Sequence, residues 1–135
     1  MFPPSTRILI VDDIQSLRDL LKAYLRRLGY WNLLEAQDGQ EALDILWQAQ
    51  SAKEEIGLVI SDWNMPVMTG LELLKRVRMV PDWKNLPFLL LTTESEKARV
   101  VQAVQAHVSN YMVKPIDEAT LKEKLFKVWE KATKG

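Results

Sequence analysis

The stretch VISDWNMP, from Val59 to Pro66, decides the expected fold and raises the first functional question. Its first residues are apolar and β-branched, which is typical of a buried strand, and its Met-Pro pair breaks the chain. Between the two, Asp62 stands at the tip of the strand. One carboxylate at a strand end indicates no function by itself. Its meaning depends on which other polar side chains the fold brings to the same place.

Five short apolar segments alternate with five segments of helical periodicity along the chain of 135 residues. Wholly apolar strands that alternate with helices are typical of a parallel α/β sheet covered on both faces. We therefore predict one α/β domain over residues 1–135. The expected strands cover 7–11, 31–36, 57–61, 88–92 and 110–113, and the expected helices cover 17–28, 38–49, 70–80, 95–106 and the segment that begins at 117.

The overall composition excludes several classes of protein. The chain has 18 Lys and Arg against 18 Asp and Glu, so nothing indicates the net basic face of a nucleic-acid binder. It has no cysteine and a single histidine, His107, which excludes disulfides and zinc sites built from several Cys or His. Because no segment looks like a signal peptide or a membrane span, we expect a cytoplasmic protein without a membrane anchor. We also expect no attached output domain.

Polar side chains follow four of the five expected strands at their carboxyl ends, where ligands bind in open α/β sheets. Three clustered carboxylates repel one another and favour a bound cation. Oxygen ligands without His or Cys suit Mg²⁺, which completes its octahedron with waters and phosphate oxygens. The residues are Asp12 and Asp13 after the first strand, Asp62 at the third, Thr92 at the fourth and Lys114 after the fifth.

The same residues have the parts that phosphoryl transfer requires. A lysine and a hydroxyl opposite a metal can hold the remaining oxygens of a phosphoryl group. One carboxylate is then available as a nucleophile and forms an aspartyl phosphate. Asp62, at the centre of this row of strand ends, is the best placed to do so.

Five segments, in the right order and at the right strand ends, carry a specific resemblance. They are VDD, SDWNMP, GLELLK, LLLTTE and YMVKP. With them, the chain resembles the receiver domain of two-component response regulators over its full length, and in particular the CheY-like single-domain regulators of chemotaxis. The resemblance implies a flavodoxin-like (βα)5 fold, which is doubly wound around a parallel sheet of strand order 2-1-3-4-5.

The resemblance also implies the chemical role of the residues at the strand ends. Asp62 is the aspartate that becomes phosphorylated. Asp12 and Asp13 bind Mg²⁺, together with Asp62 and the backbone carbonyl of Asn64. Lys114 pairs with the phosphoryl group, and its peptide bond to the following proline is expected to be cis.

Four residues are implied to control the switch and its lifetime. Thr92 is the hydroxyl that turns toward the phosphoryl oxygen, and Tyr111 is the aromatic side chain that moves inward with it. Asn64 and Glu94, two residues beyond the acceptor and the switch threonine, tune self-catalysed dephosphorylation. Both are polar and can orient a water, so we expect a short-lived phosphoryl state.

The resemblance implies a phosphorylation-controlled signalling switch rather than an enzyme. A histidine kinase is the expected donor, docking on the first helix near Ile14, Gln15 and Arg18. A downstream protein, expected to be a flagellar switch protein, binds the face formed by 95–106, 110–113 and the last helix. A phosphatase is a further candidate partner, whereas nucleic acid and membrane are not expected. The alternative within the family is an intermediate of a phosphorelay.

The sequence departs from the family pattern before the last strand. His107 stands where a helix-ending glycine is common, so either it adopts a left-handed conformation or the helix ends differently. Ser109 and Asn110 stand where small residues or glycine are common. These changes fall on the expected partner-binding face, so they bear on the partner rather than on the chemistry.

Two other functions use related sites. A haloacid-dehalogenase-type phosphatase also has an aspartate nucleophile at a strand end, but it needs an acid/base two residues later, where this chain has Asn64. A flavodoxin-like cofactor binder needs a loop rich in glycine and hydroxyl groups after the first strand. The acidic segment DDIQS repels phosphate there unless a cation intervenes. The sequence therefore favours the switch over both alternatives.

Overall fold

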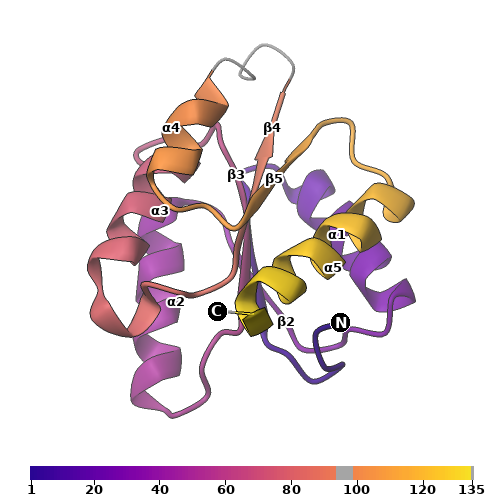
Figure 1. Ribbon diagram of the computed structural model, residues 1–135, viewed down its shortest axis with the longest axis horizontal. Coiled ribbons are helices and arrows are strands. Elements are labelled where there is room, and N and C mark those ends of the chain that lie inside the picture. Colours follow the sequence, from indigo (N-terminus) through magenta and orange to yellow (C-terminus); the bar gives the residue numbers. More distant parts are fainter. Residues whose placement is uncertain (94–98, 135) are drawn as a thin grey trace.

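Five parallel strands form one central sheet with helices on both faces, as the computed structural model shows for residues 1–93 and 99–134 (Figure 1). The strands are β1 (Ile8–Val11), β2 (Leu33–Ala36), β3 (Leu58–Asp62), β4 (Phe88–Thr92) and β5 (Asn110–Val113). The helices are α1 (Gln15–Arg27), α2 (Gly39–Ser51), α3 (Gly70–Met79), α4 (Val100–Gln105) and α5 (Glu118–Lys134), and a 3₁₀ turn, η1 (Pro81–Trp83), follows α3.

The strand order is β2-β1-β3-β4-β5, and every neighbouring pair is parallel, which confirms the predicted flavodoxin-like topology. The register aligns the carboxyl ends of the strands. Val11 of β1 lies opposite Ser61 of β3, and Thr92 of β4 lies opposite Val113 of β5. Residues that directly follow these ends therefore meet at one edge of the sheet.

Two apolar cores lie on the two faces of the sheet, because successive strand side chains point to opposite sides. On one face, Ile8 and Ile10 pack with leucines of α1 and α5. On the other, Leu9 and Val11 pack with the apolar sides of α2, α3 and α4. The strands are buried from both directions, which explains why their sequences are apolar without alternation.

The ends of the helices agree with the sequence signals. Asp38 caps α2 by accepting a hydrogen bond from the backbone N–H of Glu41 at 2.8 Å, and Asp117 likewise accepts one from Thr120 at 2.7 Å. After α4, His107 has a φ of +64°, so the left-handed conformation is the one that the chain adopts. Residues 95–98 of the fourth expected helix lie outside the described residues.

One apolar side chain lies differently from the prediction. The helical spacing of Ala42, Leu43, Leu46 and Trp47 predicts one inward apolar side, but Trp47 is 49% exposed. Its ring packs against that of Trp83 in η1, with a distance of 4.5 Å between the ring centroids. The helical period places Trp47 at the margin of the core, where the 3₁₀ turn provides a partner that the sequence pattern does not reveal.

Across the described ranges 1–93 and 99–134, no helix has both the length and the apolar character that crossing a bilayer requires.

Candidate functional site

Three carboxylates converge at the carboxyl edge of the sheet. Asp12 and Asp13 follow β1, and Asp62 is the last residue of β3. One carboxylate oxygen from each lies within 4.8 Å of the others. Asp12 and Asp62 are buried, whereas Asp13 is exposed. The structure therefore brings together the three aspartates that the sequence selected.

A lysine that directly follows β5 completes the group. The Nζ of Lys114 lies 2.8 Å from the Oδ1 of Asp62, and the backbone N–H of Trp63 donates to the same oxygen at 2.9 Å. The backbone N–H of Lys114 donates to the carbonyl of Thr92 at 2.7 Å, which fixes the start of the loop to the end of β4. The peptide bond between Lys114 and Pro115 is cis, as predicted.

Asp12 is held in an environment that disfavours its charge. Its side chain is fully buried, and its Oδ1 accepts a hydrogen bond from the backbone N–H of Ile14 at 2.9 Å. Its Oδ2 has no hydrogen-bond partner among the described residues. Burial raises the pKa of Asp12 to about 6, against the hydrogen bond from Ile14, and repulsion from Asp62 adds to the increase.

These features fit a hard divalent cation. Three carboxylates and one lysine leave an excess of negative charge, and the buried Oδ2 of Asp12 has no donor within residues 1–93 and 99–134. All the donor atoms are oxygens, as Mg²⁺ prefers, and the exposed side of the cluster at Asp13 leaves room for water ligands. The acidic cluster could therefore hold a metal ion.

Arg18 contacts the backbone of the acidic site, and the sequence did not predict this contact. We expected Arg18 on an exposed kinase-docking surface, but it is 8% exposed and that part of the prediction was wrong. It lies on the side of α1 that faces the end of β2, where its Nε pairs with Glu35 at 3.0 Å. Its Nη1 donates to the backbone carbonyl of Asp12 at 2.5 Å. Ile14, by contrast, is 47% exposed, and Gln15 is also exposed.

The predicted switch residues occupy the neighbouring strands. Thr92 is fully buried at the end of β4, with its Oγ1 donating to the carbonyl of Thr93 at 3.3 Å. Tyr111 of β5 is half-buried, and the Nζ of Lys124 lies 5.3 Å from the centroid of its ring. Asn64 is exposed beyond β3, whereas Glu94 lies outside the described residues.

The family model of the response regulator receiver domain matches residues 8–126. The chain belongs to this family. Its aspartates, lysine and threonine therefore lie at the carboxyl edge of the sheet of a receiver domain, and the family is one of signalling proteins. The match to the family model extends over nearly the whole chain and is not limited to one motif.

The chain is also similar to individual proteins of this family that are named as chemotaxis proteins. The chain is 45% identical over 125 residues to chemotaxis protein CheY-3 of Vibrio cholerae, covering 93% of this chain and 92% of that one. It is 44% identical over 119 residues to the CheY homolog of Campylobacter jejuni, covering 88% of each. Among solved structures, CheY4 of Vibrio cholerae is 38% identical with a TM-score of 0.79, covering 92% of this chain and 98% of that one.

A glycine allows α3 to start directly against the end of β3. The backbone N–H of Gly70 donates to the carbonyl of Trp63 at 2.8 Å. A Cβ at Gly70 would lie 2.1 Å from the carbonyl oxygen of Asp62, which no side chain can tolerate. No sequence pattern indicates this role of Gly70, because its close approach to the backbone of Asp62 depends on the tertiary packing of α3.

Gly70→Ala is therefore expected to destabilise the protein by about 3 kcal/mol, since backbone atoms must move to admit the methyl group. Urea denaturation measures the change. Lys75→Ala, at an exposed position of the same helix, is the control and should change the stability by less than about 0.5 kcal/mol. Equal stability of Gly70→Ala and the natural protein would contradict the close approach.

Proposed function

We propose that this receiver domain is a phosphorylation switch that accepts a phosphoryl group from a histidine kinase on Asp62. The observation that carries the proposal is the ion pair of 2.8 Å between Asp62 and Lys114 beside the carboxylates of Asp12 and Asp13. A buried acceptor, an opposing cation and an acidic cluster are the groups that phosphoryl transfer to a carboxylate needs. The domain extends over residues 1–135 in this proposal.

The transfer is a displacement at phosphorus. A carboxylate oxygen of Asp62 attacks the phosphorus of the kinase phosphohistidine and forms an O–P bond. The N–P bond breaks, and its electron pair stays on the imidazole nitrogen. Lys114, which already pairs with Asp62, offsets the charge that the phosphoryl oxygens bring to the buried carboxylate. Asp62 itself is a reactant, so the domain is not an enzyme with a separate substrate.

The acidic cluster is the proposed Mg²⁺ site. Asp12, Asp13 and Asp62, with the backbone carbonyl of Asn64, would hold the ion, which supplies charge neutralisation and a ligand position for a phosphoryl oxygen. Arg18 holds the backbone carbonyl of Asp12 and so orients the first of these ligands.

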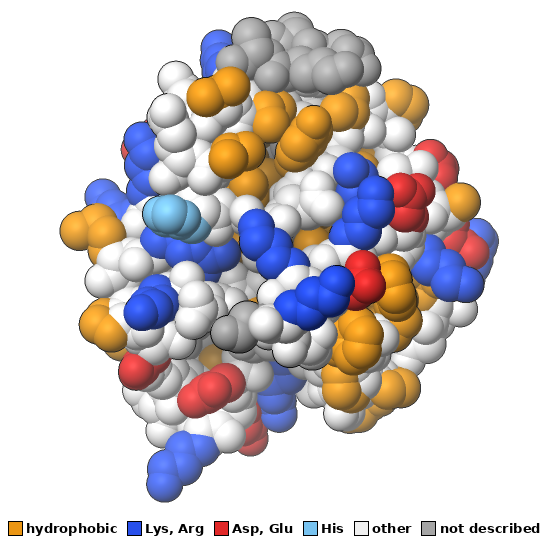
Figure 2. All heavy atoms as spheres, in the orientation of Figure 1, with side chains coloured by type: hydrophobic (Ala, Val, Ile, Leu, Met, Phe, Trp, Pro, Cys, Tyr) orange, Lys and Arg blue, Asp and Glu red, His pale blue; other side chains and the backbone are white. Residues whose placement is uncertain are grey.

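The proposed output is a change at the face formed by α4, β5 and α5, and in Figure 1 the strand β5 lies between the two helices. Thr92 turns its hydroxyl toward the phosphoryl oxygen, and Tyr111 in β5 follows it inward. Valines 101 and 104 on α4 are 63% and 60% exposed, and Phe126 on α5 is 43% exposed. Figure 2 shows hydrophobic side chains gathered in the upper part of this face. Exposed apolar side chains of this kind suit a protein partner.

Chemotaxis is the proposed pathway, because the relatives from Vibrio cholerae and Campylobacter jejuni are named as chemotaxis proteins. The downstream partner would then be a protein of the flagellar switch. A place within a phosphorelay is the second candidate. In that case the phosphoryl group would pass from Asp62 to a histidine of another protein rather than to water.

A transfer experiment tests the proposal and separates the two pathways. A histidine kinase carrying labelled phosphate is mixed with the protein or with Asp62→Asn, and the label is followed on a gel. We expect transfer to the natural protein only. Addition of a histidine phosphotransfer protein should leave the label in place or release it as inorganic phosphate. Onward transfer would favour the phosphorelay, and label on Asp62→Asn would contradict the proposed acceptor.

The phosphorylated state is expected to be short-lived, because Asn64 is exposed beside the acceptor and can orient an attacking water, as can Glu94. Asn64→Leu should lengthen the lifetime several-fold, which is less than the roughly hundredfold or more of a general acid or base, because an amide orients water without transferring its proton. Loss of label from the purified phosphoprotein measures it. A lifetime of many hours for the natural protein at neutral pH would contradict this prediction.

A further inference from the structure

A cavity lies at the opposite end of the sheet from the acidic site, near the amino ends of β4 and β5. Its volume is about 730 Å³. Four basic side chains from separate parts of the chain line it, and none of its lining residues is Asp or Glu. We call this cavity the basic pocket. Its basic side chains are Arg78 of α3, Lys84 after η1, His107 after α4 and Lys131 of α5. In Figure 2, Lys and Arg side chains gather around the pale blue side chain of the single histidine.

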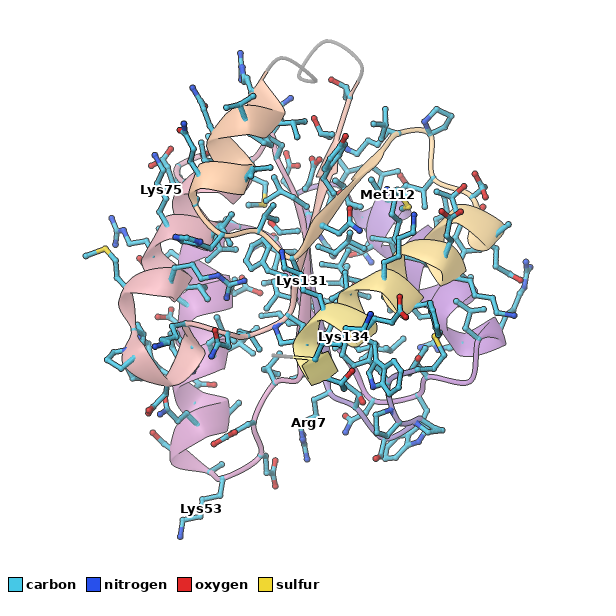
Figure 3. The ribbon with its side chains drawn as sticks, viewed as in Figure 1. Arg7, Lys53, Lys75, Met112, Lys131 and Lys134 are labelled. Carbon is cyan, nitrogen blue, oxygen red and sulfur yellow. The ribbon has the colours of Figure 1, made fainter. Side chains whose placement is uncertain are left out.

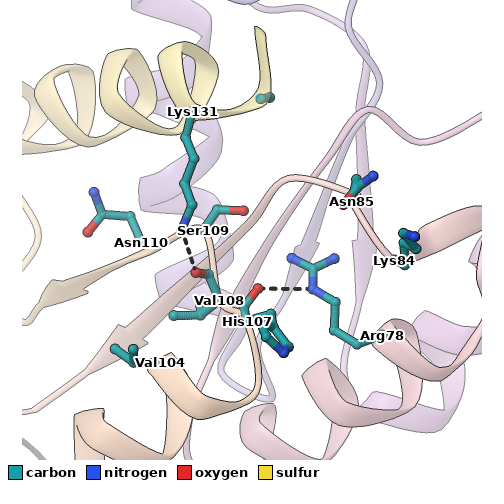
Figure 4. A pocket seen from close by; sticks show the side chains of 10 residues that line it. Arg78, Lys84, Asn85, Val104, His107, Val108, Ser109, Asn110 and Lys131 are labelled. Atoms are coloured by element: carbon teal, nitrogen blue, oxygen red, sulfur yellow. Dashed lines mark hydrogen bonds between the residues drawn. The ribbon is translucent and has the colours of Figure 1, made fainter. Parts of the chain in front are cut away.

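Four backbone carbonyls around the basic pocket accept hydrogen bonds from its basic side chains. Arg78 donates from Nε to the carbonyl of His107 at 3.0 Å, and from Nη1 to the carbonyls of Trp83 and Leu86 at 3.0 and 2.7 Å. Lys131 donates to the carbonyl of Val108 at 3.3 Å. Figure 4 shows Arg78 and Lys131 approaching the same turn from two sides.

Donors, by contrast, are in surplus. Within the described residues, the basic side chains of the pocket form no salt bridge with a carboxylate. The Oδ1 of Asn110 accepts from the backbone N–H of Tyr111, and the Oγ of Ser109 accepts from that of Phe88. The amide hydrogens of Asn110 and the hydroxyl hydrogen of Ser109 therefore remain for a ligand. A pocket with filled acceptors and open donors is complementary to an oxyanion.

The wall of the pocket includes a strained residue. His107 has a φ of +64°, a conformation that non-glycine residues rarely adopt. The hydrogen bond from Arg78 to its carbonyl holds this turn in place. Strained backbone conformations that neighbouring contacts hold in place are more frequent at ligand-binding and switch sites.

We propose that the basic pocket binds a small polyanion that carries phosphate or clustered carboxylate groups. The volume of about 730 Å³ is in the range of pockets for small molecules, and its concave form suits them better than a peptide segment. Arg78 stays cationic at neutral pH, although burial lowers its pKa to about 10. This ligand would be distinct from the phosphoryl group at Asp62, and the inference does not depend on the proposed function.

The basic side chains also have a structural role, which the test must separate from binding. The pocket lies near the ends of α3, α4 and α5, and cations stabilise the carboxyl ends of helices. That role involves the carbonyls already bonded to Arg78 and Lys131. Lys84 forms no such bond among the described residues, so its side chain is available for an anion without disturbing a helix end.

The test is a titration of the full-length ¹⁵N-labelled protein, without Mg²⁺ and at constant ionic strength. Sodium pyrophosphate and sodium citrate are added in separate experiments, and amide signals are followed. Two double variants are compared: Lys84→Ala with Lys131→Ala, and Lys75→Ala with Lys122→Ala. The second pair removes the same charge from exposed positions outside the pocket, and Figure 3 shows Lys75 at the outer edge of α3, away from Lys131.

We expect saturable shifts at the amides of Asn85, Ser109 and Asn110 with at least one of the two anions. The response to each anion identifies phosphate or carboxylate as the recognised group. The Lys84 and Lys131 double variant should weaken binding by about tenfold or more, and the control by less than about twofold. Equal weakening in both variants, or shifts confined to the acidic site, would overturn the proposal. So would the absence of saturable binding.

Discussion

Replacing Asp12 with asparagine is expected to remove metal-dependent phosphorylation and, at the same time, to stabilise the protein in the absence of Mg²⁺. The two effects have the same origin. Asp12 is fully buried, its Oδ2 has no donor among the described residues, and Asp62 lies beside it. Folding therefore costs free energy at this position, and a bound cation would offset it.

The expected gain in the free energy of unfolding is about 1–3 kcal/mol at neutral pH. The upper end is set by the rise of the pKa from 3.8 to about 6, which corresponds to about 3 kcal/mol. A folded-state pKa above the unfolded value means that the penalty is complete above pH 6 and disappears as the pH falls toward 4. The advantage of Asp12→Asn should follow the same course. Urea denaturation in the presence of a chelator measures it.

Exposed Asp44 of α2 provides the control, because Asp44→Asn should change neither stability nor phosphorylation appreciably. Mg²⁺ should stabilise the natural protein in proportion to the logarithm of its concentration above the dissociation constant, and this gain should be lost in Asp12→Asn. A variant that is less stable than the natural protein without Mg²⁺ would show that Asp12 has a structural role instead.

Lys114→Met is expected to slow phosphorylation by about a hundredfold or more, which is the usual effect of removing one charge-stabilising donor. Its effect on stability should be opposite to that of Asp12→Asn. The Nζ of Lys114 lies 2.8 Å from Asp62, whose side chain is only 5% exposed. Loss of the cation leaves the carboxylate with the hydrogen bond from Trp63, so we expect destabilisation by about 1–3 kcal/mol.

Lys127→Met is the matched control for Lys114→Met. Lys127 pairs with Glu123 at 3.0 Å, but both side chains are more than half exposed. Exposed pairs contribute less than about 1 kcal/mol, so stability and phosphorylation should stay near those of the natural protein. Equal effects of the two lysine variants would mean that net charge, rather than the contact with Asp62, controls the reaction.

The sequence predicted the sheet and the acidic site because both depend on local patterns. Strands buried on both faces are apolar runs, and their carboxyl ends are placed by the order of the elements alone. Asp12, Asp62 and Lys114 were therefore found from their positions after strands. The cis peptide bond after Lys114 and the strand order were found through the resemblance to receiver domains.

The features that the sequence did not reveal depend on contacts between distant segments. Arg18 is hydrophilic and was placed on the surface, yet Glu35 and the carbonyl of Asp12 give it a buried set of partners. Trp47 was placed in the core, but its partner is Trp83, which lies after α3. The basic pocket likewise unites residues of three helices and two loops. No spacing along the chain indicates such a set.

The central claim is that Asp62 accepts a phosphoryl group with the help of a divalent cation. Intact mass after incubation with acetyl phosphate, with and without Mg²⁺, tests it most directly when Asp62→Asn is measured in parallel. The account predicts a gain of one phosphoryl group that requires Mg²⁺ and is absent from Asp62→Asn. No gain under any condition, or an equal gain in the variant, would contradict it and leave the acidic edge of the sheet as a site for another ligand.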